Sequence, residues 1–347
     1  MSNYFEGRKV FLTGACGTVG RELLRQVVSQ KPYEIVAIDN NESELFFLSE
    51  EYRSQSNVQL FMGDLRDADK LANAMRGMEL VLHTAALKHV ILCERSPRDP
   101  VQTNVLGTQN VIDAAIANRV DRMIFTSSDK AVNPTNVMGT TKLLGERLVT
   151  AANAHKRGVW PIFSSTRFGN VLGSRGSVIP LFRRQIAAGG PVTLTDPNMT
   201  RFVMTLQDAV RLVMNSMPLA RGGEVFVTKM AIARIIDLAE IMIEELAPHY
   251  GYRPTQIKIE HIGSKPGEKL YEELMNDEET RRTIELKDYF VITPAFTSVY
   301  ENVDYTYQGV VSSVIARPYN SAVEPSLPKE QLRSYMLEND LLSLVGI

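Results

Sequence analysis

Three consecutive residues, Ser128, Asp129 and Lys130, combine a hydroxyl, a carboxylate and an amine. They follow the apolar run at residues 123–125, which we expect to be a parallel strand. Side chains at the carboxyl ends of parallel strands line the crevice in which α/β proteins bind ligands. A carboxylate and an amine there can act as general acid and base if the site moves their pKa values toward neutrality. The alternative is a solvated ion pair at the surface.

A second pair, Met138 and Lys142, follows on an expected helix. The two residues are four positions apart, so they share a helix face and point toward the same small volume. A thioether cannot take up a proton. Either other side chains therefore supply the acid–base chemistry at this point, or the protein is catalytically inactive.

A glycine-rich turn with Gly14, Gly17 and Gly20 follows the first apolar run, residues 10–12. Glycines let the backbone approach a pyrophosphate, and the amide groups that open the next helix can bind it. The GxxGxxG spacing differs from GxGxxG, and glycines after strands also make ordinary tight loops. The position of this turn in the first strand-helix-strand unit favours a dinucleotide.

Asp39 ends the second expected strand, 19 residues after Gly20. A carboxylate there can accept hydrogen bonds from the adenosine ribose 2′-hydroxyl and repels a 2′-phosphate, and no Arg follows at positions 40–42. The sequence therefore predicts NAD rather than NADP, the alternative being that Asp39 caps the next helix. Asp64, after the third strand, is consistent with an adenine contact and with a helix cap.

Apolar, β-branched runs alternate with helical patterns over the first half of the chain. Strands are expected at 10–12, 35–38, 58–62, 80–82, 123–125 and 160–166, and helices at 19–29, at 100–117 and from Met138 onward. This order predicts an α/β protein with a Rossmann-type, doubly wound parallel sheet.

The second half is expected to form a smaller C-terminal substrate-binding lobe. We place the NAD-binding domain at residues 1–170, with a return near 205–230, and the lobe and a C-terminal tail at 171–347. Helices are expected at 206–217 and 235–246 and strands at 224–227 and 257–262. Beyond about Phe290 the Tyr- and Ser-rich sequence has weak periodicity and predicts no element.

The composition excludes several classes of protein. The 347 residues are 44% hydrophobic and 22% charged, with a net charge of -2 and no block of like charges, which argues against disorder and against a nucleic-acid partner. Cys16 and Cys93 fit neither a disulfide framework nor a metal site and favour a reducing compartment. No stretch approaches the roughly 20 apolar residues of a membrane span, and no signal peptide is evident. We expect a cytoplasmic protein without membrane or metal.

Several separated motifs together resemble the UDP-N-acetylglucosamine 4,6-dehydratases, which are extended short-chain dehydrogenase/reductases. The motifs occur in order at residues 85–90, 127–139, 167–174, 200–202 and 265–269, within a match over about 8–280. The superfamily usually combines a Ser or Thr with a Tyr and a Lys spaced as YxxxK, and in this chain the Tyr position is Met138. Some members of the dehydratase family also have Met there.

The resemblance implies roles for the central residues. Asp129 and Lys130 would be the catalytic acid–base pair, and Ser128 would hydrogen-bond the substrate O4. Lys142 would hold the nicotinamide ribose, with Met138 as an apolar neighbour. Hydride leaves C4 for NAD, water is lost across C5 and C6, and hydride returns to C6. Lys130 would need to be neutral to remove the C5 proton, and the division of acid and base roles between it and Asp129 stays open.

The resemblance also implies a set of contacts to cofactor and substrate. The residues expected around NAD are Gly14, Gly17, Thr18, Val19, Gly20, Asp39, Asn40, Asp64, Leu65, Ala85, Ala86, Lys88, Asn104 and Lys142. The residues expected around a UDP-sugar are Lys88, His89, Asn170, Ser174, Val178, Thr193, Arg201, Lys265 and Glu268. Arg201 could instead form a structural ion pair, Lys265 and Glu268 an ordinary charged turn, and His89 a purely structural contact.

Two alternative functions and some details stay open at this point. A UDP-sugar 4-epimerase would use the same oxidation at C4, but such enzymes generally need the Tyr that Met138 replaces. A catalytically silent NAD-binding regulatory protein is argued against by the presence of Ser128 and Lys142. The start close to the first strand resembles a free-standing catalytic domain, and mixed branch features leave the configuration at C5 open. A homo-oligomer is expected by analogy alone.

Overall fold

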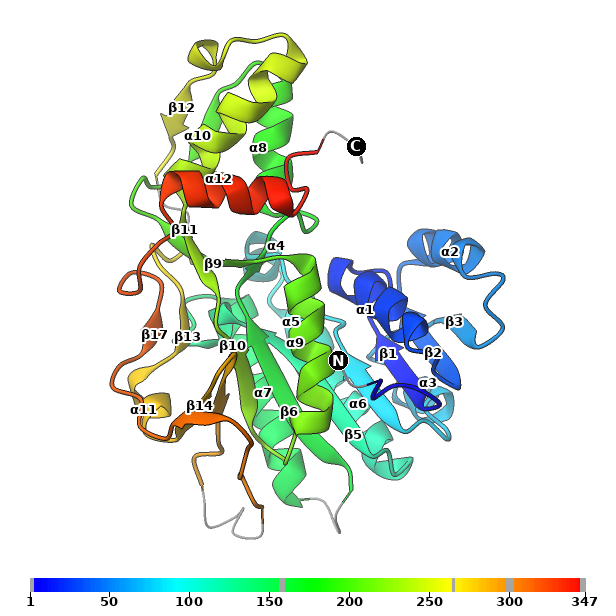
Figure 1. Cartoon of the computed structure of the whole chain (residues 1–347). Coiled ribbons are helices and arrows are strands. Elements are labelled where there is room, and N and C mark those ends of the chain that lie inside the picture. Colours follow the sequence, from blue (N-terminus) through cyan, green and yellow to red (C-terminus); the bar gives the residue numbers. More distant parts are fainter. Residues whose placement is uncertain (1–2, 156–159, 264–265, 297–302, 344–347) are drawn as a thin grey trace.

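The computed structural model describes residues 3–155, 160–263, 266–296 and 303–343. Figure 1 shows a large twisted sheet with helices on both faces and a smaller lobe beyond one end of the strands. The central sheet has the order β16-β14-β15-β10-β6-β5-β4-β1-β2-β3. The predicted α/β, Rossmann-type architecture is confirmed.

The seven strands from β3 to β10 in this order are all parallel. They are β1 Lys9–Thr13, β2 Glu34–Asp39, β3 Val58–Met62, β4 Leu80–His83, β5 Arg122–Ser128, β6 Ile162–Phe168 and β10 Val225–Thr228. The order of the strands reverses direction at β1 and β4, so the crevice for a ligand lies at the carboxyl ends of these two strands. The predicted strands are confirmed, and the one expected at 224–227 is the seventh of the parallel set.

Helices cover both faces of the parallel strands. On one face α1 (Thr18–Ser29) packs against α9 (Leu206–Leu219), with α2 (Glu42–Glu51) beside α1. On the other face lie α3 (Ala68–Ala74), α6 (Gly107–Ala117) and α7 (Val137–His155). The helix predicted at 100–117 begins as α5 (Arg98–Pro100) and passes through a π-helical segment, η1 (Val101–Leu106), before α6; α4 spans Val90–Arg95.

Three antiparallel strands extend the sheet beyond β10: β14 (Thr283–Leu286), β15 (Tyr289–Ile292) and β16 (Val310–Ser312). The sequence predicted no element beyond Phe290, yet Val291 and Ile292 are buried against the parallel part of the sheet. The predicted return near 205–230 corresponds to α9 and β10, and these three later strands lie on the same sheet. The division at residue 170 stays a prediction.

The smaller lobe has a core of its own between α8 (Val178–Ala187), α10 (Ile235–Leu246) and α12 (Lys329–Glu338). The short strands β8 (Val192–Leu194) and β12 (Ile259–His261) pair beside these helices, and η3 (Ala247–Tyr250) and η4 (Pro254–Gln256) follow α10. Figure 1 shows α8, α10 and β12 farthest from the sheet, with α12 across their base.

Short strands connect the lobe to the central sheet. β7 (Asn170–Val171), β9 (Thr200–Met204) and β11 (Ala231–Arg234) form one small sheet, and β13 (Glu273–Met275) pairs with β17 (Tyr319–Asn320). α11 (Asp277–Thr280) follows β13, and η2 (Asp129–Ala131) follows β5. The segments that lead into and out of the lobe therefore pass the carboxyl ends of β5 and β6.

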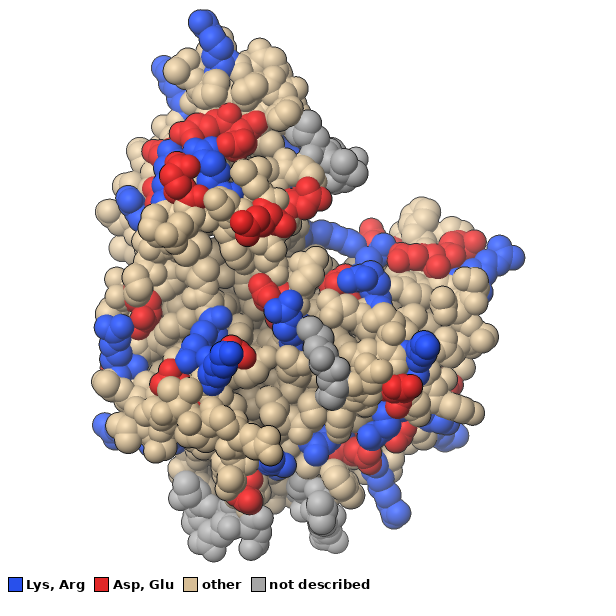
Figure 2. All heavy atoms as spheres, viewed as in Figure 1, with Lys and Arg blue, Asp and Glu red and all other residues tan. Residues whose placement is uncertain are grey.

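Charged residues of both signs are mixed over the face in Figure 2. On the lobe, Lys329 and Arg333 of α12 form ion pairs with Glu240, Glu244 and Glu245 of α10. Exposed pairs of this kind contribute at most about 1 kcal/mol each. Over the described residues, the structure contains no helix whose length and apolar character would let it cross a membrane.

Candidate functional site

The residues Ser128, Asp129 and Lys130 form a connected cluster where β5 ends and η2 begins. The Ser128 hydroxyl donates to Asp129 Oδ1 at 2.6 Å, and the backbone N–H and Nζ of Lys130 donate to the same oxygen at 2.9 and 3.1 Å. The Asp129 side chain is only 1% exposed. This burial excludes the alternative of a solvated surface pair.

A second carboxylate, Glu272, faces Lys130 from the segment just before β13. Its Oε1 lies 3.4 Å from Lys130 Nζ and 3.8 Å from Arg201 Nε, and its side chain is 3% exposed. Lys130 Nζ also donates to Asn170 Oδ1 at 3.4 Å. Burial lowers the pKa of Lys130, but the charges of Asp129 and Glu272 outweigh it and raise that pKa above its ordinary value.

Two oxygens in this cluster are unsatisfied. Asp129 Oδ2 and Glu272 Oε2 are both buried, and neither has a hydrogen-bond partner among the residues that the structure describes. Buried polar atoms without a partner are uncommon in folded proteins and call for an explanation. Burial, together with the charge of Asp129, raises the pKa of Glu272. The two oxygens are the ones that remain available for groups of a ligand.

Met138 and Lys142 lie on the first turns of α7, both buried. Lys142 Nζ donates to the carbonyl oxygen of Thr126 at 2.9 Å and lies 4.7 Å from the centre of the Phe125 ring. Burial lowers the pKa of Lys142 to about 8. The predicted pair thus shares one helix face, with the ammonium group against the carboxyl end of β5.

Gly139, which sequence reasoning did not single out, lets α7 lie directly against η2. A β-carbon at this position would lie 2.2 Å from the carbonyl oxygen of Lys130. Because this neighbour is backbone, any larger residue would displace η2 or α7. The sequence contains no signal for this role beyond the presence of a glycine inside a helix.

The glycine turn has the close backbone contacts expected of a pyrophosphate loop. Gly14 has φ +76°, and a β-carbon there would lie 2.7 Å from the backbone nitrogen of Ala85. A β-carbon at Gly20 would lie 1.9 Å from the Gly14 carbonyl oxygen. α1 begins at Thr18 after Gly17, and no side chain among the described residues caps it. The amide groups of its first turn, including Val19, can therefore bind an anion.

Asp39 is bonded to this loop and does not cap a helix. Its Oδ2 accepts from the Cys16 backbone N–H and its Oδ1 from the Asn41 N–H, both at 2.9 Å. Asn41, not Asp39, caps α2 by accepting from the Glu44 N–H. The helix-cap alternative for Asp39 is therefore wrong, and its carboxylate stands at the edge of the crevice.

Asp64 lies near the same edge and is held by Arg66. Arg66 donates two side-chain hydrogen bonds to it, at 2.9 and 2.6 Å, and these bonds lower the pKa of Asp64 to about 2. A weaker hydrogen bond comes from Asn40. α3 is capped by Asp67, so Asp64 has no capping role there. The residues around the turn fit a dinucleotide with an unmodified adenosine ribose.

The loop after β4 closes the crevice from the opposite side. Asn104 is buried and bonds both backbone groups of Leu87, at 2.8 and 2.9 Å, and the Thr141 hydroxyl at 3.0 Å. Through these bonds it holds Ala85 and Ala86 next to the glycine turn. Leu65 is buried farther back, against Gly107.

Segment 173–177 bridges the glycine turn and the loop after β4. The Arg175 guanidinium donates to the Cys16 carbonyl at 3.1 Å, and the backbone carbonyl of Arg175 accepts from Lys88 Nζ at 3.0 Å. The His89 ring lies against Gly176, where a β-carbon would be 2.6 Å from His89 Cε1. Arg175 was missed because it is 159 positions from Cys16 in the chain, and only the fold brings the two together.

The other residues expected around a UDP-sugar are spread more widely. Arg201 donates to the carbonyls of Thr200, Leu270 and Lys269 and faces Glu268 at 3.8 Å. This internal ion pair is the alternative that the sequence named, and the contact of Arg201 with a UDP-sugar stays a prediction. Ser174 lies in the bridging segment, and Val178 opens α8. Thr193 bonds Gln185 inside the lobe. Lys265 lies outside the described residues.

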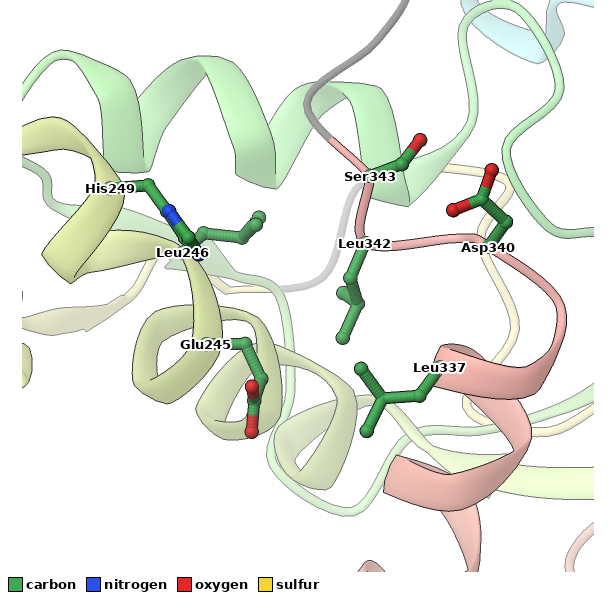
Figure 3. A pocket seen from close by; sticks show the side chains of 7 residues that line it. All are labelled: Glu245, Leu246, His249, Leu337, Asp340, Leu342 and Ser343. Atoms are coloured by element: carbon green, nitrogen blue, oxygen red, sulfur yellow. The ribbon is translucent and has the colours of Figure 1, made fainter.

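A separate hollow of about 210 Å³ lies in the lobe, between α10, η3 and the end of α12 (Figure 3). Its lining residues are Glu245, Leu246, His249, Leu337, Asp340, Leu342 and Ser343. No described residue that the sequence predicted for NAD or sugar lines it. This hollow is therefore not part of the candidate site.

Comparison with known proteins gives one matching family model, described as polysaccharide biosynthesis protein, over residues 10–294. An uncharacterized membrane protein of Methanocaldococcus jannaschii is 46% identical, with 97% of this chain and 98% of that protein covered. A UDP-N-acetylglucosamine 4,6-dehydratase (inverting) of Campylobacter jejuni is 36% identical over 87% of each chain. A UDP-glucose 4-epimerase of Rickettsia canadensis is 34% identical over 96% of each chain.

Solved structures give the same pattern. Pen from Bacillus thuringiensis is 42% identical, with a TM-score of 0.91 over 98% of this chain and 100% of that one. DesIV, a dTDP-glucose 4,6-dehydratase from Streptomyces venezuelae solved with NAD, is 21% identical, with a TM-score of 0.67 over 76% of this chain and 86% of that one. The second likeness is one of fold alone.

Proposed function

The chain belongs to the polysaccharide biosynthesis protein family, and from this premise we propose that it is an NAD-dependent 4,6-dehydratase acting on UDP-N-acetylglucosamine. The observation that carries the proposal is the hydrogen-bonded cluster of Ser128, Lys130 and the buried Asp129 beside a helix that has Met138 in place of a phenol. Acid–base groups are thus present without a tyrosine. The Campylobacter relative, named as this dehydratase, supports the substrate.

NAD would occupy the crevice between the glycine turn and Asp39. Because Gly14 and Gly20 have no side chains, the turn packs tightly and its backbone amides can approach a pyrophosphate. Asp39 can accept hydrogen bonds from both hydroxyls of an unphosphorylated ribose. Lys142 lies at the carboxyl end of β5, where the nicotinamide ribose would come. The chemistry that NAD supplies when bound is reversible acceptance of a hydride from C4.

The residues of the chain then move the protons. Asp129 has one oxygen held by three hydrogen bonds and a second oxygen free, and that free oxygen takes the O4 proton as hydride leaves C4. The 4-ketone acidifies the C5 proton, which Lys130 removes as a free amine. Asp129 returns its proton to O6, which leaves as water. Asn170, bonded to Lys130 Nζ, orients the amine.

A UDP-sugar 4-epimerase is the second candidate, because the Rickettsia relative carries that name. An epimerase would need the same oxidation at C4 but a return of hydride to C4. Epimerisation needs one group to exchange the O4 proton, whereas Lys130 has two carboxylates beside it, and Met138 offers no phenol for that exchange. Dehydration therefore accounts for more of the site.

One incubation distinguishes the two reactions. The purified protein is given UDP-N-acetylglucosamine in deuterated water, and the product is followed by mass spectrometry and NMR. Loss of one water with a 4-keto, 6-deoxy spectrum is the expected result, and the C5 signal reports whether configuration is retained or inverted. A C4 epimer of unchanged mass would replace dehydration with epimerisation.

Asp129→Asn tests the assignment of the acid–base pair. The amide retains the shape of the side chain but cannot take the O4 proton, so turnover should fall by about 100-fold or more while bound NAD is retained. Cofactor content is read from the absorbance of the extract, and turnover from product formation. Unchanged turnover would refute the role of Asp129.

A further inference from the structure

Glu272 is a buried carboxyl group to which neither the sequence nor the proposed chemistry has assigned a role. Its side chain is 3% exposed, and its position is held by backbone bonds to Ser321, whose Oγ lies 2.9 Å from the Glu272 nitrogen and whose N–H donates to the Glu272 carbonyl at 2.9 Å. These two bonds fix the backbone of Glu272 beside β13, and its side chain reaches Lys130. Burial of a carboxylate is costly unless it is paired or hydrogen-bonded.

The two carboxyl groups that face Lys130 differ in what stabilises their charge. Asp129 Oδ1 accepts three hydrogen bonds. Glu272 Oε2 has no hydrogen-bond partner among the residues that the structure describes, and Glu272 Oε1 lies in ionic contact with Lys130 and Arg201, at 3.4 and 3.8 Å. Hydrogen bonds to a carboxylate favour its ionised form, and in their absence burial and the charge of Asp129 raise the pKa of Glu272.

Lys130 needs a proton acceptor because it rests as an ammonium ion between two carboxylates. Its elimination chemistry requires the free amine. We propose, resting on the dehydration proposed above, that Glu272 takes the proton of the Lys130 ammonium and holds it during turnover. Glu272 acts on the substrate only through Lys130, so it is a positioning residue: it sets where the Lys130 proton lies.

The step balances without any further reactant. The Nζ–H bond breaks and an O–H bond forms on Glu272, and no electron pair is transferred to or from a cofactor. Lys130 then forms a new N–H bond with the C5 proton, while the C–H electron pair makes the C5–C6 double bond and O6 leaves with the proton from Asp129. When C5 is reprotonated, Lys130 becomes a free amine again.

The surroundings favour this transfer because the charge of the cluster does not change. Before transfer, Asp129 and Glu272 balance Lys130 and Arg201. After transfer, the charges of Asp129 and Arg201 remain, and those of Glu268 and Lys269, which also face the cluster, are unchanged. A buried site therefore accommodates both states without burying a net charge. The 3.4 Å separation of Nζ and Oε1 is typical of catalytic contacts before substrate tightens them.

The first test is the pH profile of turnover in Glu272→Gln. The glutamine retains the size of the side chain but cannot take the proton, so turnover at pH 7 should fall by about 100-fold. Removal of the nearby negative charge of Glu272 lowers the pKa of Lys130. Turnover of the variant should therefore rise again as the pH is increased. Glu272→Asp should be less impaired than Glu272→Gln, because it still has a proton acceptor.

Glu273→Gln is the matched control. Glu273 is the next residue but bonds Asn133 and pairs with Lys269, away from Lys130, so this variant should retain wild-type turnover and pH dependence. A Glu272→Gln variant that is impaired by the same factor at every pH, or that is as active as the control, would overturn the proposal. The first of these results would assign Glu272 a purely structural role.

An infrared measurement keeps this inference separate from the proposed reaction. The difference spectrum between wild type and Glu272→Gln is recorded at pH 7 with NAD and UDP-N-acetylglucosamine added. The expected result is the C=O band of a protonated carboxyl group that the variant lacks. A carboxylate band instead would overturn the proposal. Absence of dehydration by the wild type would refute the proposed function but leave this spectrum to decide on Glu272.

Discussion

The neutral state of His83 should make the stability of the protein depend on pH. His83 ends β4 and is fully buried, with Nδ1 2.7 Å from the Thr13 hydroxyl and Nε2 3.1 Å from the Thr108 hydroxyl. Burial, with a smaller contribution from the charge of Lys142, lowers its pKa from 6.5 to about 3. Folding therefore requires the uncharged ring.

The direction and the size of the effect follow from these two pKa values. Because the folded pKa is the lower one, the unfolded chain binds a proton first as the pH falls. The stabilisation is fully present above the unfolded pKa of 6.5 and is lost as the pH falls toward 3. Between pH 7 and pH 5 the protonation of the unfolded state alone should lower the free energy of unfolding by about 2 kcal/mol.

Urea unfolding followed by circular dichroism at pH 7 and pH 5 measures this loss. His83→Gln is the comparison, because glutamine can bond both hydroxyls but does not titrate. The variant is expected to be less stable than wild type at pH 7, yet its loss between the two pH values should be smaller by about 2 kcal/mol. Equal losses in wild type and variant would refute the reasoning.

Three further predictions concern packing, buried charge and the cofactor. Gly139→Ala places a β-carbon 2.2 Å from the Lys130 carbonyl, so displacement of η2 should lower kcat by about 100-fold, and an unchanged kcat would contradict the contact. Glu279→Gln removes one of the two carboxylates that pair with Arg167 and should lower the free energy of unfolding, measured with urea at pH 7, by about 3 to 5 kcal/mol. An unchanged free energy of unfolding would show that the pairing does not stabilise the fold. Asp39→Ala should weaken NAD binding about tenfold and reduce the difference between the affinities for NAD and NADP, as measured by calorimetry. The reason is that the carboxylate no longer accepts from the ribose or repels a 2′-phosphate. Unchanged selectivity would remove Asp39 from the ribose site.

The parallel sheet could be predicted from the sequence because each strand is a short apolar run between turn residues. β1, β2, β4, β5 and β6 are interior strands that are mostly buried, and such strands read as continuous hydrophobic segments, whereas β3 lies at the edge of the sheet. β14, β15 and β16 could not be predicted in the same way. They are three or four residues long, and β15 depends on pairing with β10, more than 60 positions earlier.

The candidate site was predictable only where its residues are contiguous. Ser128, Asp129 and Lys130 follow one strand, so their position at its carboxyl end was foreseeable. Glu272 is 142 positions after Lys130 and has Glu273 beside it, and no local pattern tells which of the two carboxylates is buried. Arg201 carried two interpretations in the sequence; the structure shows the internal ion pair, and the contact with a UDP-sugar stays a prediction.

Comparison of two charge clusters explains why we assign a structural role to one and propose a chemical role for the other. Arg167 is 1% exposed, and all four carboxylate oxygens of Glu146 and Glu279 accept hydrogen bonds from it, at 2.6 to 3.0 Å. Every oxygen in that cluster is satisfied, so it can bind nothing further and ties β6 to α11. The cluster around Lys130 has similar residue types and equally buried carboxylates, although the Lys130 side chain is 26% exposed, but Asp129 and Glu272 each leave one oxygen without a partner in the described structure. Unsatisfied buried oxygens cost stability. A fold that retains them beside a cation, at the carboxyl ends of its parallel strands, has groups ready to exchange protons with a ligand.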